Sequence, residues 1–217
     1  MRSKVYSSEN RAAIEHRTLS LLNSAETLVA ASPRGVGDAV QELLSEQFNE
    51  VLAELSHDYS STFARRAMAD LAFTDVEGCY HVVDVKTHRS DTKFNMPNLI
   101  SVERLARFYE EDTNFFSLLY VRYGVSGKRI IIDHVNFVPI EWLSWDCLTI
   151  GALGWGQLQL ANANRIDIVQ DSSRRDWMIQ PCNEILEFYP REIQKIAKRT
   201  QYFERVRRSW EAKEGSA

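Results

Sequence analysis

"ADLAFTDVEGCYHVVDVK", residues 69–86, is the stretch that decides the fold, because two strand-forming runs flank a short turn. Residues 69–74 and 78–86 each predict a strand. The segment "DVEG" between them, residues 75–78, predicts a turn with glycine where a positive φ is needed. Consecutive valines make the second run apolar on both faces, which indicates a strand inside a sheet. The sequence therefore predicts a buried β-hairpin.

One end of this hairpin carries charged side chains. Residues two apart on a strand share a face, so Asp84 and Lys86 point the same way. A one-residue bulge at Gly78 places Asp70 directly across from Asp84. Two neighbouring carboxylates repel and raise each other's pKa, and a divalent cation removes that repulsion. Oxygen ligands of this kind indicate Mg²⁺, which takes one or two carboxylates and keeps several waters.

This arrangement suits hydrolysis of a phosphodiester. We expect Asp70, Asp84 and the carbonyl of Val85 to hold Mg²⁺ against a scissile phosphate, where the metal lowers the pKa of a bound water to make the nucleophile. Lys86 orients that water or offsets charge in the transition state. The alternative is a solvated Asp–Lys pair at the end of a strand. The remaining carboxylates of the hairpin are expected to lie in the turn and face water: Asp75 and Glu77.

The rest of the chain alternates between helical and extended patterns. Together with the hairpin, these patterns predict an α/β (α+β) fold, in which helices flank a central mixed β-sheet. The expected elements are helices over 10–31, 38–55 and 97–111, a breaker over 32–37, a polar loop over 56–62, strands over 114–125 and 128–140, a strand, turn and strand over 148–169, and one or two helices from 183 to about 212.

Length and composition suit one globular domain. The 217 residues are 44% hydrophobic, which is enough to bury a sizeable core. We expect a single domain over residues 1–217. Within it, residues 1–36 are expected to form an N-terminal helical arm and residues 183–217 a C-terminal helical tail.

Composition also disfavours several classes of protein. No apolar stretch approaches the roughly 20 residues of a membrane span, and the N-terminus lacks the apolar core of a signal peptide. The three cysteines lie far apart, without the spacing of a zinc site or a disulfide framework. We therefore expect a cytoplasmic, reduced protein with no membrane partner. A net charge of −4 argues against an entirely basic surface, but DNA binding requires only a basic face.

Residues 69–106 resemble the core of the HincII family of type II restriction endonucleases, within the PD-(D/E)xK nuclease superfamily. Asp70, "DVKT" at 84–87 and "PNLIS" at 97–101 carry the resemblance. Fainter similarity covers "VGDAVQELL" and "IGALGWGQLQL". The resemblance implies a restriction-endonuclease-like fold and a homodimer that cuts both strands of a short palindromic double-stranded DNA site with Mg²⁺. It also implies 5′-phosphate ends, blunt ends, and a cognate methyltransferase that acts on the same site.

The resemblance assigns roles to particular residues. It places the metal ligands at Asp70 and Asp84 and the catalytic lysine at Lys86, while Ala69 stands where the superfamily name expects proline. The superfamily often has an acidic residue on its first core helix, and Glu42 is the candidate here, with Asp38 as the alternative. In this family a glutamine of the loop after the lysine wedges between bases. The aligned position here is Asn95, between Phe94 and Met96.

Candidate DNA contacts follow the lysine and the Gly-rich segment. Amide side chains can bind adenine and arginine can bind guanine, whereas basic side chains also position the phosphates. Taken individually, an ordinary turn or surface amide is the favoured interpretation of each. The DNA-binding candidates are Thr87, Arg89, Lys93, Asn95, Asn98, Gln157, Gln159, Asn162, Asn164 and Arg165. Further possible phosphate contacts are His88, Arg65 and Arg66.

The basic tail has two interpretations. Arg205, Arg207 and Arg208 could clamp the DNA backbone. The favoured expectation is a solvated helix that docks Phe203 and Trp210 on the core. The histidines show no ligand spacing, and His81 is expected to be a hydrogen-bonded strand residue.

Three other functions remain open from the sequence. One is a PD-(D/E)xK nuclease of a repair or structure-specific type, and another is a catalytically silent DNA-binding module. The third is a structural domain with a coincidental motif, which would show no affinity for DNA even at low salt. Digestion of a plasmid to bands or to a smear separates the two nucleases.

Overall fold

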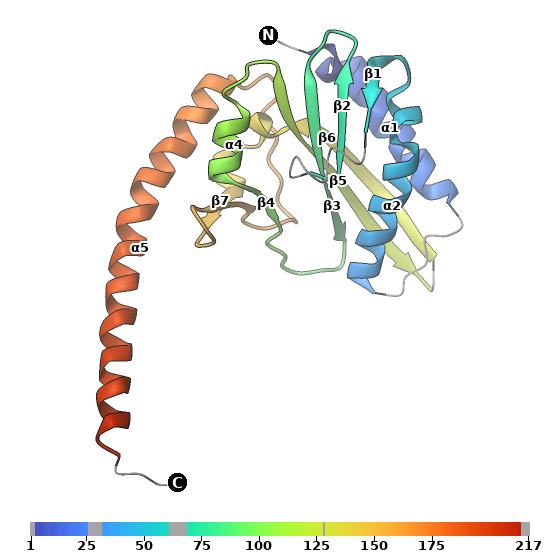
Figure 1. The fold of residues 1–217 in the computed structure, drawn as a ribbon. Coiled ribbons are helices and arrows are strands. Elements are labelled where there is room, and N and C mark those ends of the chain that lie inside the picture. The colour runs from blue at the N-terminus through green and yellow to red at the C-terminus, as the bar shows by residue number, and fades with distance from the viewer. Residues whose placement is uncertain (1–2, 26–31, 61–68, 128, 214–217) are drawn as a thin grey trace.

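The protein has a mixed five-stranded β-sheet flanked by helices (Figure 1). This computed structural model describes residues 3–25, 32–60, 69–127 and 129–213. The strand order is β1-β2-β3-β5-β6, in which β3 and β5 are parallel and the other neighbours are antiparallel. The strands are β1 (Ser56–Tyr59), β2 (Leu71–Asp75), β3 (Tyr80–Arg89), β5 (Asn114–Ser126) and β6 (Arg129–Pro139). The expected α+β class is confirmed.

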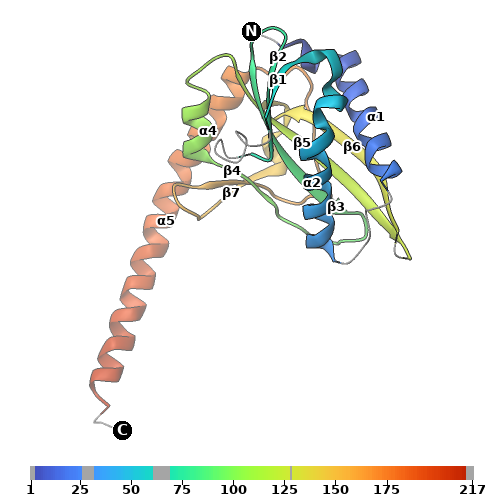
Figure 2. The ribbon, with the colours of Figure 1, turned by 45° about the vertical axis from the view of Figure 1, so that its right-hand side comes forward.

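A second, three-stranded antiparallel sheet lies beside the large one (Figures 1 and 2). Its order is β4-β8-β7. The chain passes through β4 and the short helix α4 on its way from β3 to β5, which is the long connection that parallel strands require. The elements are β4 (Asn98–Ser101), α4 (Val102–Phe108), β7 (Leu148–Gly151) and β8 (Gln157–Leu160).

Helices α1 (Ser8–Ser24) and α2 (Pro33–Leu52) cover one face of the large sheet. On α2, the buried side chains recur every three or four residues, as the sequence predicts for an amphipathic helix. Phe48 of α2 lies 6.5 Å, ring to ring, from Phe73 of β2, which pairs with His81 of β3. Odd-numbered residues of β3 near His81 therefore face the helices, and even-numbered residues face the other way.

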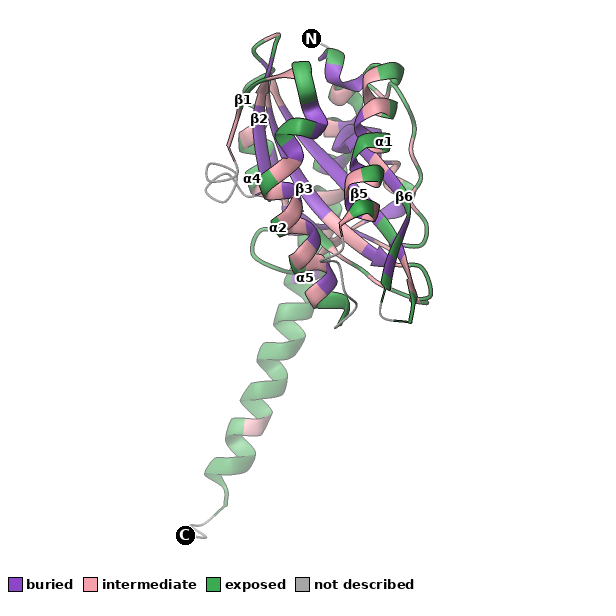
Figure 3. Cartoon of the chain, turned by 90° about the vertical axis from the view of Figure 1, so that its right-hand side faces the viewer, coloured by how far each residue is buried: buried purple, intermediate pink, exposed green. Residues whose placement is uncertain are grey.

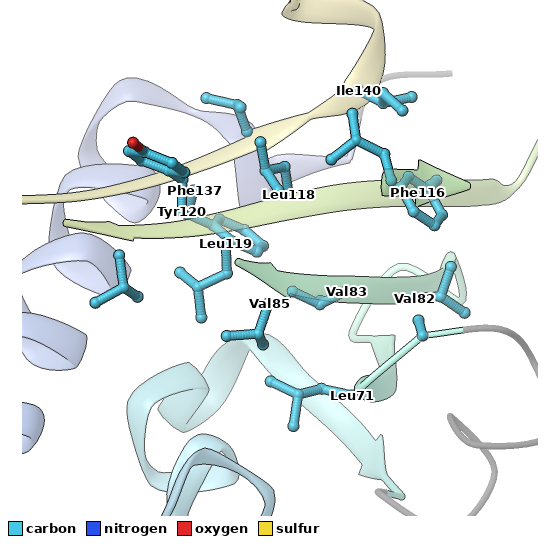
Figure 4. Packing of buried hydrophobic residues seen from close by; sticks show 14 of the residues in the cluster. Leu71, Val82, Val83, Val85, Phe116, Leu118, Leu119, Tyr120, Phe137 and Ile140 are labelled. Carbon is cyan, nitrogen blue, oxygen red and sulfur yellow. The ribbon is translucent and has the colours of Figure 1, made fainter. Parts of the chain in front are cut away.

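The opposite face of the sheet is covered by α4 and by the chain around the small sheet. Tyr80 of β3 stacks edge-on against Phe108 of α4, and the hydroxyl of Tyr120 donates to the carbonyl of Ala163 at 2.6 Å. Because β3 is buried on both faces, its valines pack in both directions; Figure 4 shows Val82, Val83 and Val85 among the core side chains.

Short 3₁₀ helices connect the larger elements. They are η1 (Lys4–Tyr6), η2 (Ala53–Leu55), η3 (Ile140–Trp142) and η4 (Trp145–Cys147). Among the described residues, no helix combines the length and the apolar character that crossing a bilayer requires.

Two sequence predictions fail where a short segment pairs with a distant one. The polar loop expected at 56–62 contains the edge strand β1, which pairs with β2 and stays polar because one edge faces solvent. The helix expected over 97–111 is divided between β4 and α4. Pairing with β8 supplies the backbone hydrogen bonds of β4. A short apolar run alone does not show whether a distant strand is available to pair with it.

The first two helices also differ from expectation at their ends. Helix α2 begins at Pro33, inside the expected breaker, because Ser32 accepts from the Gly35 N–H at 3.0 Å and proline suits the first helical turn. Glycine suits position 37 of α2 because the helix passes close to β3 there: a Cβ would lie only 3.3 Å from Thr87 Oγ1. Helix α1 ends at Ser24; the rest of the helix expected over 10–31 lies largely outside the described residues.

The N-terminal residues belong to the body of the protein. The expected arm boundary at residue 36 falls inside α2, and α1 packs on β6 with Ile14 and Leu22 buried. The expectation that Asp75 faces water is wrong. Its carboxylate is buried and bonds Ser3 Oγ at 2.5 Å and His81 Nε2 at 3.0 Å, so it anchors the N-terminus to β3. The prediction of a hydrogen-bonded His81 is confirmed.

The C-terminal tail is one helix, α5 (Arg174–Glu211), which starts nine residues before the expected tail. Its first half docks through buried Trp177, Pro181 and Glu192, and the remainder runs away from the body (Figures 1 and 3). The expectation that Phe203 and Trp210 dock on the core is wrong, because both side chains are largely exposed.

Candidate active site

The hairpin has the register that brings the two carboxylates together. Thr74 pairs with Tyr80 and Leu71 with Val83, where the pairing of β2 with β3 ends. Asp70, just before β2, donates its N–H to the Val83 carbonyl at 3.0 Å, which brings Asp70 beside Asp84. The extra residue is accommodated next to Gly78, whose φ of 81° is the left-handed conformation expected of a bulged turn. The Asp75 N–H donates to the Cys79 carbonyl and the Gly78 N–H to the Asp75 carbonyl, so the turn closes around Gly78.

Asp84 is a buried and only partly satisfied carboxylate. Its Oδ1 accepts from Lys86 Nζ at 2.6 Å, whereas Oδ2 is buried without a hydrogen-bond partner among the described residues. Burial raises the pKa of Asp84 to about 7; Asp70 adds to the rise and Lys86 opposes it. An unsatisfied buried carboxylate oxygen is costly unless another group, such as a cation, completes its shell.

Asp70 lies just before the first residue of β2, where β2 no longer covers the edge of β3. Its Oδ2 accepts from the Val85 N–H at 2.7 Å, and its own N–H donates to the Val83 carbonyl at 3.0 Å. Burial raises the pKa of Asp70, while the Val85 N–H and Lys86 oppose the rise. Alternate residues of a strand direct their carbonyls to the same side, so the Val85 carbonyl also points toward this edge. All three expected metal ligands therefore lie at one end of the hairpin.

Helix α2 adds acidic side chains on the side of Asp70. A pocket of about 250 Å³ lies between them, lined by Asp38, Gln41, Glu42, Ser45 and Asp70. Both sequence candidates, Glu42 and Asp38, line this pocket. Asp84 is even-numbered on β3 and faces away from α2, so the structure brings the two helix acids to Asp70 but not to Asp84.

Gln41 is a site residue that sequence reasoning missed. Its Nε2 lies 3.5 Å from the Val85 carbonyl oxygen, the third expected metal ligand. The available signal was its position one helical turn after Gly37, on the face of α2 that approaches β3. Gln41 is thus placed to orient the carbonyl or to be displaced from it by a ligand.

The oxygen donors at this end of the hairpin suit Mg²⁺. Within the described ranges, no three His, Cys, Asp or Glu side chains gather as an all-protein metal site. Mg²⁺ needs fewer protein ligands, because it retains several waters and accepts one or two carboxylates. Asp70, Asp84 and the Val85 carbonyl provide oxygen donors, and the unpartnered Oδ2 of Asp84 provides a vacant acceptor. These groups fit a magnesium ion.

Three of the expected DNA-binding amides share one face of the small sheet. Gln159 pairs with Asn98 and with Thr149, and its Nε2 donates to Asn98 Oδ1 at 2.5 Å. Gln157 lies on the same face, two residues before Gln159, while the intervening Leu158 is buried. We call Asn98, Gln157 and Gln159 the amide face.

The amides of the segment that follows β8 bond to the protein itself. The Asn164 amide donates to the carbonyls of Thr92 and Lys93 at 2.8 and 3.1 Å, and its oxygen lies 2.9 Å from His88 Nε2. Asn162 Oδ1 accepts from the Asn164 N–H at 3.0 Å. These amides fix the loop after β3, and buried His88 belongs to the same network, so it is not placed to reach a phosphate. The side chain of Arg165 is exposed.

The loop after β3 contains the other expected DNA contacts. Lys93 is exposed, Thr87 and Asn95 are half-buried, and Arg89 pairs with Asp91 at 2.7 Å. The two apolar neighbours of Asn95 are also exposed: Phe94 and Met96. Arg65 and Arg66 lie outside the described residues.

Comparison with known proteins assigns no family to the chain. No family model matches it. No curated protein matches it at a significant level.

Proposed function

We propose that the protein is a Mg²⁺-dependent endonuclease of the type II restriction kind, which cuts both strands of a short palindromic double-stranded DNA site. The observation that carries this proposal is the geometry at the end of the hairpin. Asp70 lies beside Asp84 at the end of the β2–β3 pairing, Lys86 Nζ contacts Asp84 Oδ1 at 2.6 Å, and Asp84 Oδ2 is buried and unpartnered among the described residues. Such a carboxylate pair with a lysine is what the Asp…Asp-x-Lys motif requires.

The order of elements supports the PD-(D/E)xK fold as part of the proposal. A hairpin carries the motif, a parallel strand follows beside it, and α2 packs against the hairpin with acidic side chains. This is the arrangement implied by the resemblance of residues 69–106 to the HincII family.

Each residue of the motif has a distinct task in this proposal. Asp70 and Asp84 hold the metal with the Val85 carbonyl, and Gln41 and the Val85 N–H fix the edge that presents them. Bound Mg²⁺ would neutralise phosphate charge and lower the pKa of a water. The Lys86 ammonium, which contacts Asp84, would offset the charge on the phosphate as water attacks phosphorus and the P–O3′ bond breaks, which gives 5′-phosphate and 3′-hydroxyl ends.

The amide face supports DNA as the substrate. Asp84, Lys86 and His88 point to the side of the large sheet on which the small sheet lies, so DNA over the carboxylates would pass Asn98 and Gln159. Amides suit the donor and acceptor pattern of adenine, and exposed Phe94 and Met96 suit apolar contact with bases.

The test is digestion of supercoiled plasmid by the purified protein in Mg²⁺ or in EDTA. The proposal predicts discrete fragments with Mg²⁺, none with EDTA, and a loss of about a hundredfold or more for Asp84→Ala. The matched control is Asp133→Ala, which removes a partly exposed carboxylate paired with Arg122 on β5.

The other outcomes assign a different function. A smear with Mg²⁺ would indicate a nuclease without a defined site, of the repair or structure-specific type. DNA that is retarded in a gel but never nicked would indicate a catalytically silent binding module. Sequencing the fragment ends then gives the recognition site and shows whether the ends are blunt.

A further inference from the structure

The outer part of α5 carries an apolar stripe that the body of the single chain leaves largely exposed. The helix docks at its base, where Trp177 Nε1 donates to the Leu143 carbonyl at 2.8 Å and Tyr189 donates to the Trp155 carbonyl at 2.7 Å. Beyond this point it projects from the body, and its surface is almost wholly exposed (Figure 3). Large apolar side chains on such a helix indicate an interaction surface.

The spacing of these side chains is that of a coiled-coil seam. One series of positions (186, 193, 200 and 207) and a second (189, 196, 203 and 210) each recur every seven residues. Alternating steps of three and four residues lead from one series to the other. Five of the six side chains expose more than half of their surface, and the sixth, Tyr189, is partly exposed. A stripe of this period is narrower than the apolar face of a membrane-surface helix, and it favours a left-handed pair of helices. The seam consists of Leu186, Tyr189, Ile193, Ile196, Phe203 and Trp210.

Apart from Tyr189, whose hydroxyl bonds Trp155 where the helix leaves the body, the seam points away from the protein's own body. The buried contacts of the base, Trp177 and Pro181, lie on the opposite side of the helical wheel from the series of Leu186 and Ile193. The body of the same chain therefore leaves the seam open to a second molecule.

We infer that the seam is covered by the same seam of a second copy of this chain, in a parallel, in-register coiled coil. In that arrangement Arg199, just before the seam, faces Glu204 of the second copy, and the contact occurs twice by symmetry. Arg199 and Glu204 are five apart, too far around one helix to pair with each other, and neither forms an ion pair within the described residues.

An antiparallel pair fits less well. If Ile193 met Trp210 of the second copy, Ile196 would meet Arg207; if Ile193 met Ile196 instead, Arg199 would lie level with Pro190 and far from Glu204. In the parallel pair, each apolar side chain packs against the same residue of the second chain. Polar Thr200 and Arg207 occupy two further seam positions and fix the register. Burial of the six side chains on both helices covers on the order of 1,000 Å², near the lower range of specific interfaces.

This inference does not rest on the nuclease proposal. It would place the two bodies side by side at the same end of the helix pair, since both chains run in the same direction. Two hairpin sites could then act on the two strands of one duplex, but the pairing stands whether or not the protein cuts DNA.

The experiment is analytical ultracentrifugation of the full-length protein. The wild type is expected to sediment at twice the 25.0 kDa chain mass, and Ile193→Lys as a monomer. Gln194→Lys is the matched control, because it introduces the same charge on the next residue, off the seam. Both side chains are exposed, so circular dichroism should show an unchanged fold in both variants.

A charge exchange tests the parallel register. Arg199→Glu is expected to weaken the dimer about tenfold, because it makes two attractive pairs repulsive, and adding Glu204→Arg should restore it. A monomeric wild type, equal dissociation of Gln194→Lys, or no rescue by the exchange would overturn the inference. Binding of monomeric wild type to vesicles of anionic phospholipid, lost in Ile193→Lys, would assign the stripe to a membrane surface instead.

Discussion

Replacing Asp84 by asparagine should make the metal-free protein more stable at neutral and alkaline pH. Burial raises the pKa of this carboxyl from 3.8 to about 7, with Asp70 adding to the rise and Lys86 opposing it. The folded protein therefore holds the proton more tightly than the unfolded chain does. This favours folding at low pH, and the advantage is lost as pH rises from about 4 toward 7.

The magnitude follows from the size of the pKa difference. A rise from 3.8 to about 7 corresponds to on the order of 4 kcal/mol of lost stability above pH 7, at about 1.36 kcal/mol per pKa unit. At pH 5 the loss is about 1.5 kcal/mol. Asp84→Asn removes the titration, so its free energy of unfolding relative to wild type should increase by roughly 2–3 kcal/mol between pH 5 and pH 8.

The assay is urea unfolding in EDTA at pH 5, 6.5 and 8. Asp133→Asn is the control, since its carboxylate is partly exposed and pairs with Arg122 at the surface. Adding Mg²⁺ at pH 8 should stabilise the wild type by mass action but not Asp84→Asn. A stability difference between Asp84→Asn and wild type that does not change with pH would refute the reasoning, as would equal stabilisation of both by Mg²⁺.

The remaining predictions concern single residues of the hairpin. Lys86→Ala should abolish cleavage while Mg²⁺ still raises the melting temperature, because the lysine acts on the phosphate and not as a metal ligand; loss of both would contradict that role. Burial raises the pKa of Asp75, but hydrogen bonds from His81, Ser3 and Cys79 outweigh it and lower the pKa to about 2. Its stabilisation is thus present above about pH 4 and lost as pH falls toward 2, and Asp75→Ala should cost about 3 kcal/mol at pH 7 in urea unfolding. Gly78→Ala should cost about 1–2 kcal/mol through backbone strain alone, because nothing lies within 4 Å of the added Cβ; a neutral result would contradict the left-handed turn.

The hairpin was predictable because short-range chemistry determines it. Gly78 sets the turn, and the register that follows from it brings Asp70 to the end of the β2–β3 pairing, beside Asp84. The long strands β5 and β6 were also predictable from their apolar runs.

Elements that depend on distant partners were not predictable. Strand β1 is polar and β4 is four residues long, and each is a strand only because β2 or β8 supplies its hydrogen bonds. The burial of Asp75 depends on Ser3, which is 72 residues away in the sequence. Composition near a turn contains no information about such a contact.

The candidate site shows the same division. That Asp84 and Lys86 share a face follows from strand geometry. Asn164 instead donates to two carbonyls of a loop 71 and 72 residues earlier, and nothing near Asn164 in the sequence predicts that contact. Likewise, the expectation that Phe203 and Trp210 dock on the core assumed that apolar side chains in the tail are covered by their own chain. Both side chains are exposed, and their seven-residue spacing is the pattern from which we infer a second chain.

Anomalous scattering from crystals soaked in Mn²⁺ is the most direct test of a cation between the two carboxylates. We predict one peak at about 2 Å from an oxygen of Asp70 and an oxygen of Asp84, with the Val85 carbonyl as a third ligand and the Lys86 ammonium turned away from the metal. Absence of a peak there, or a metal held only by Asp38 and Glu42 on α2, would contradict the account.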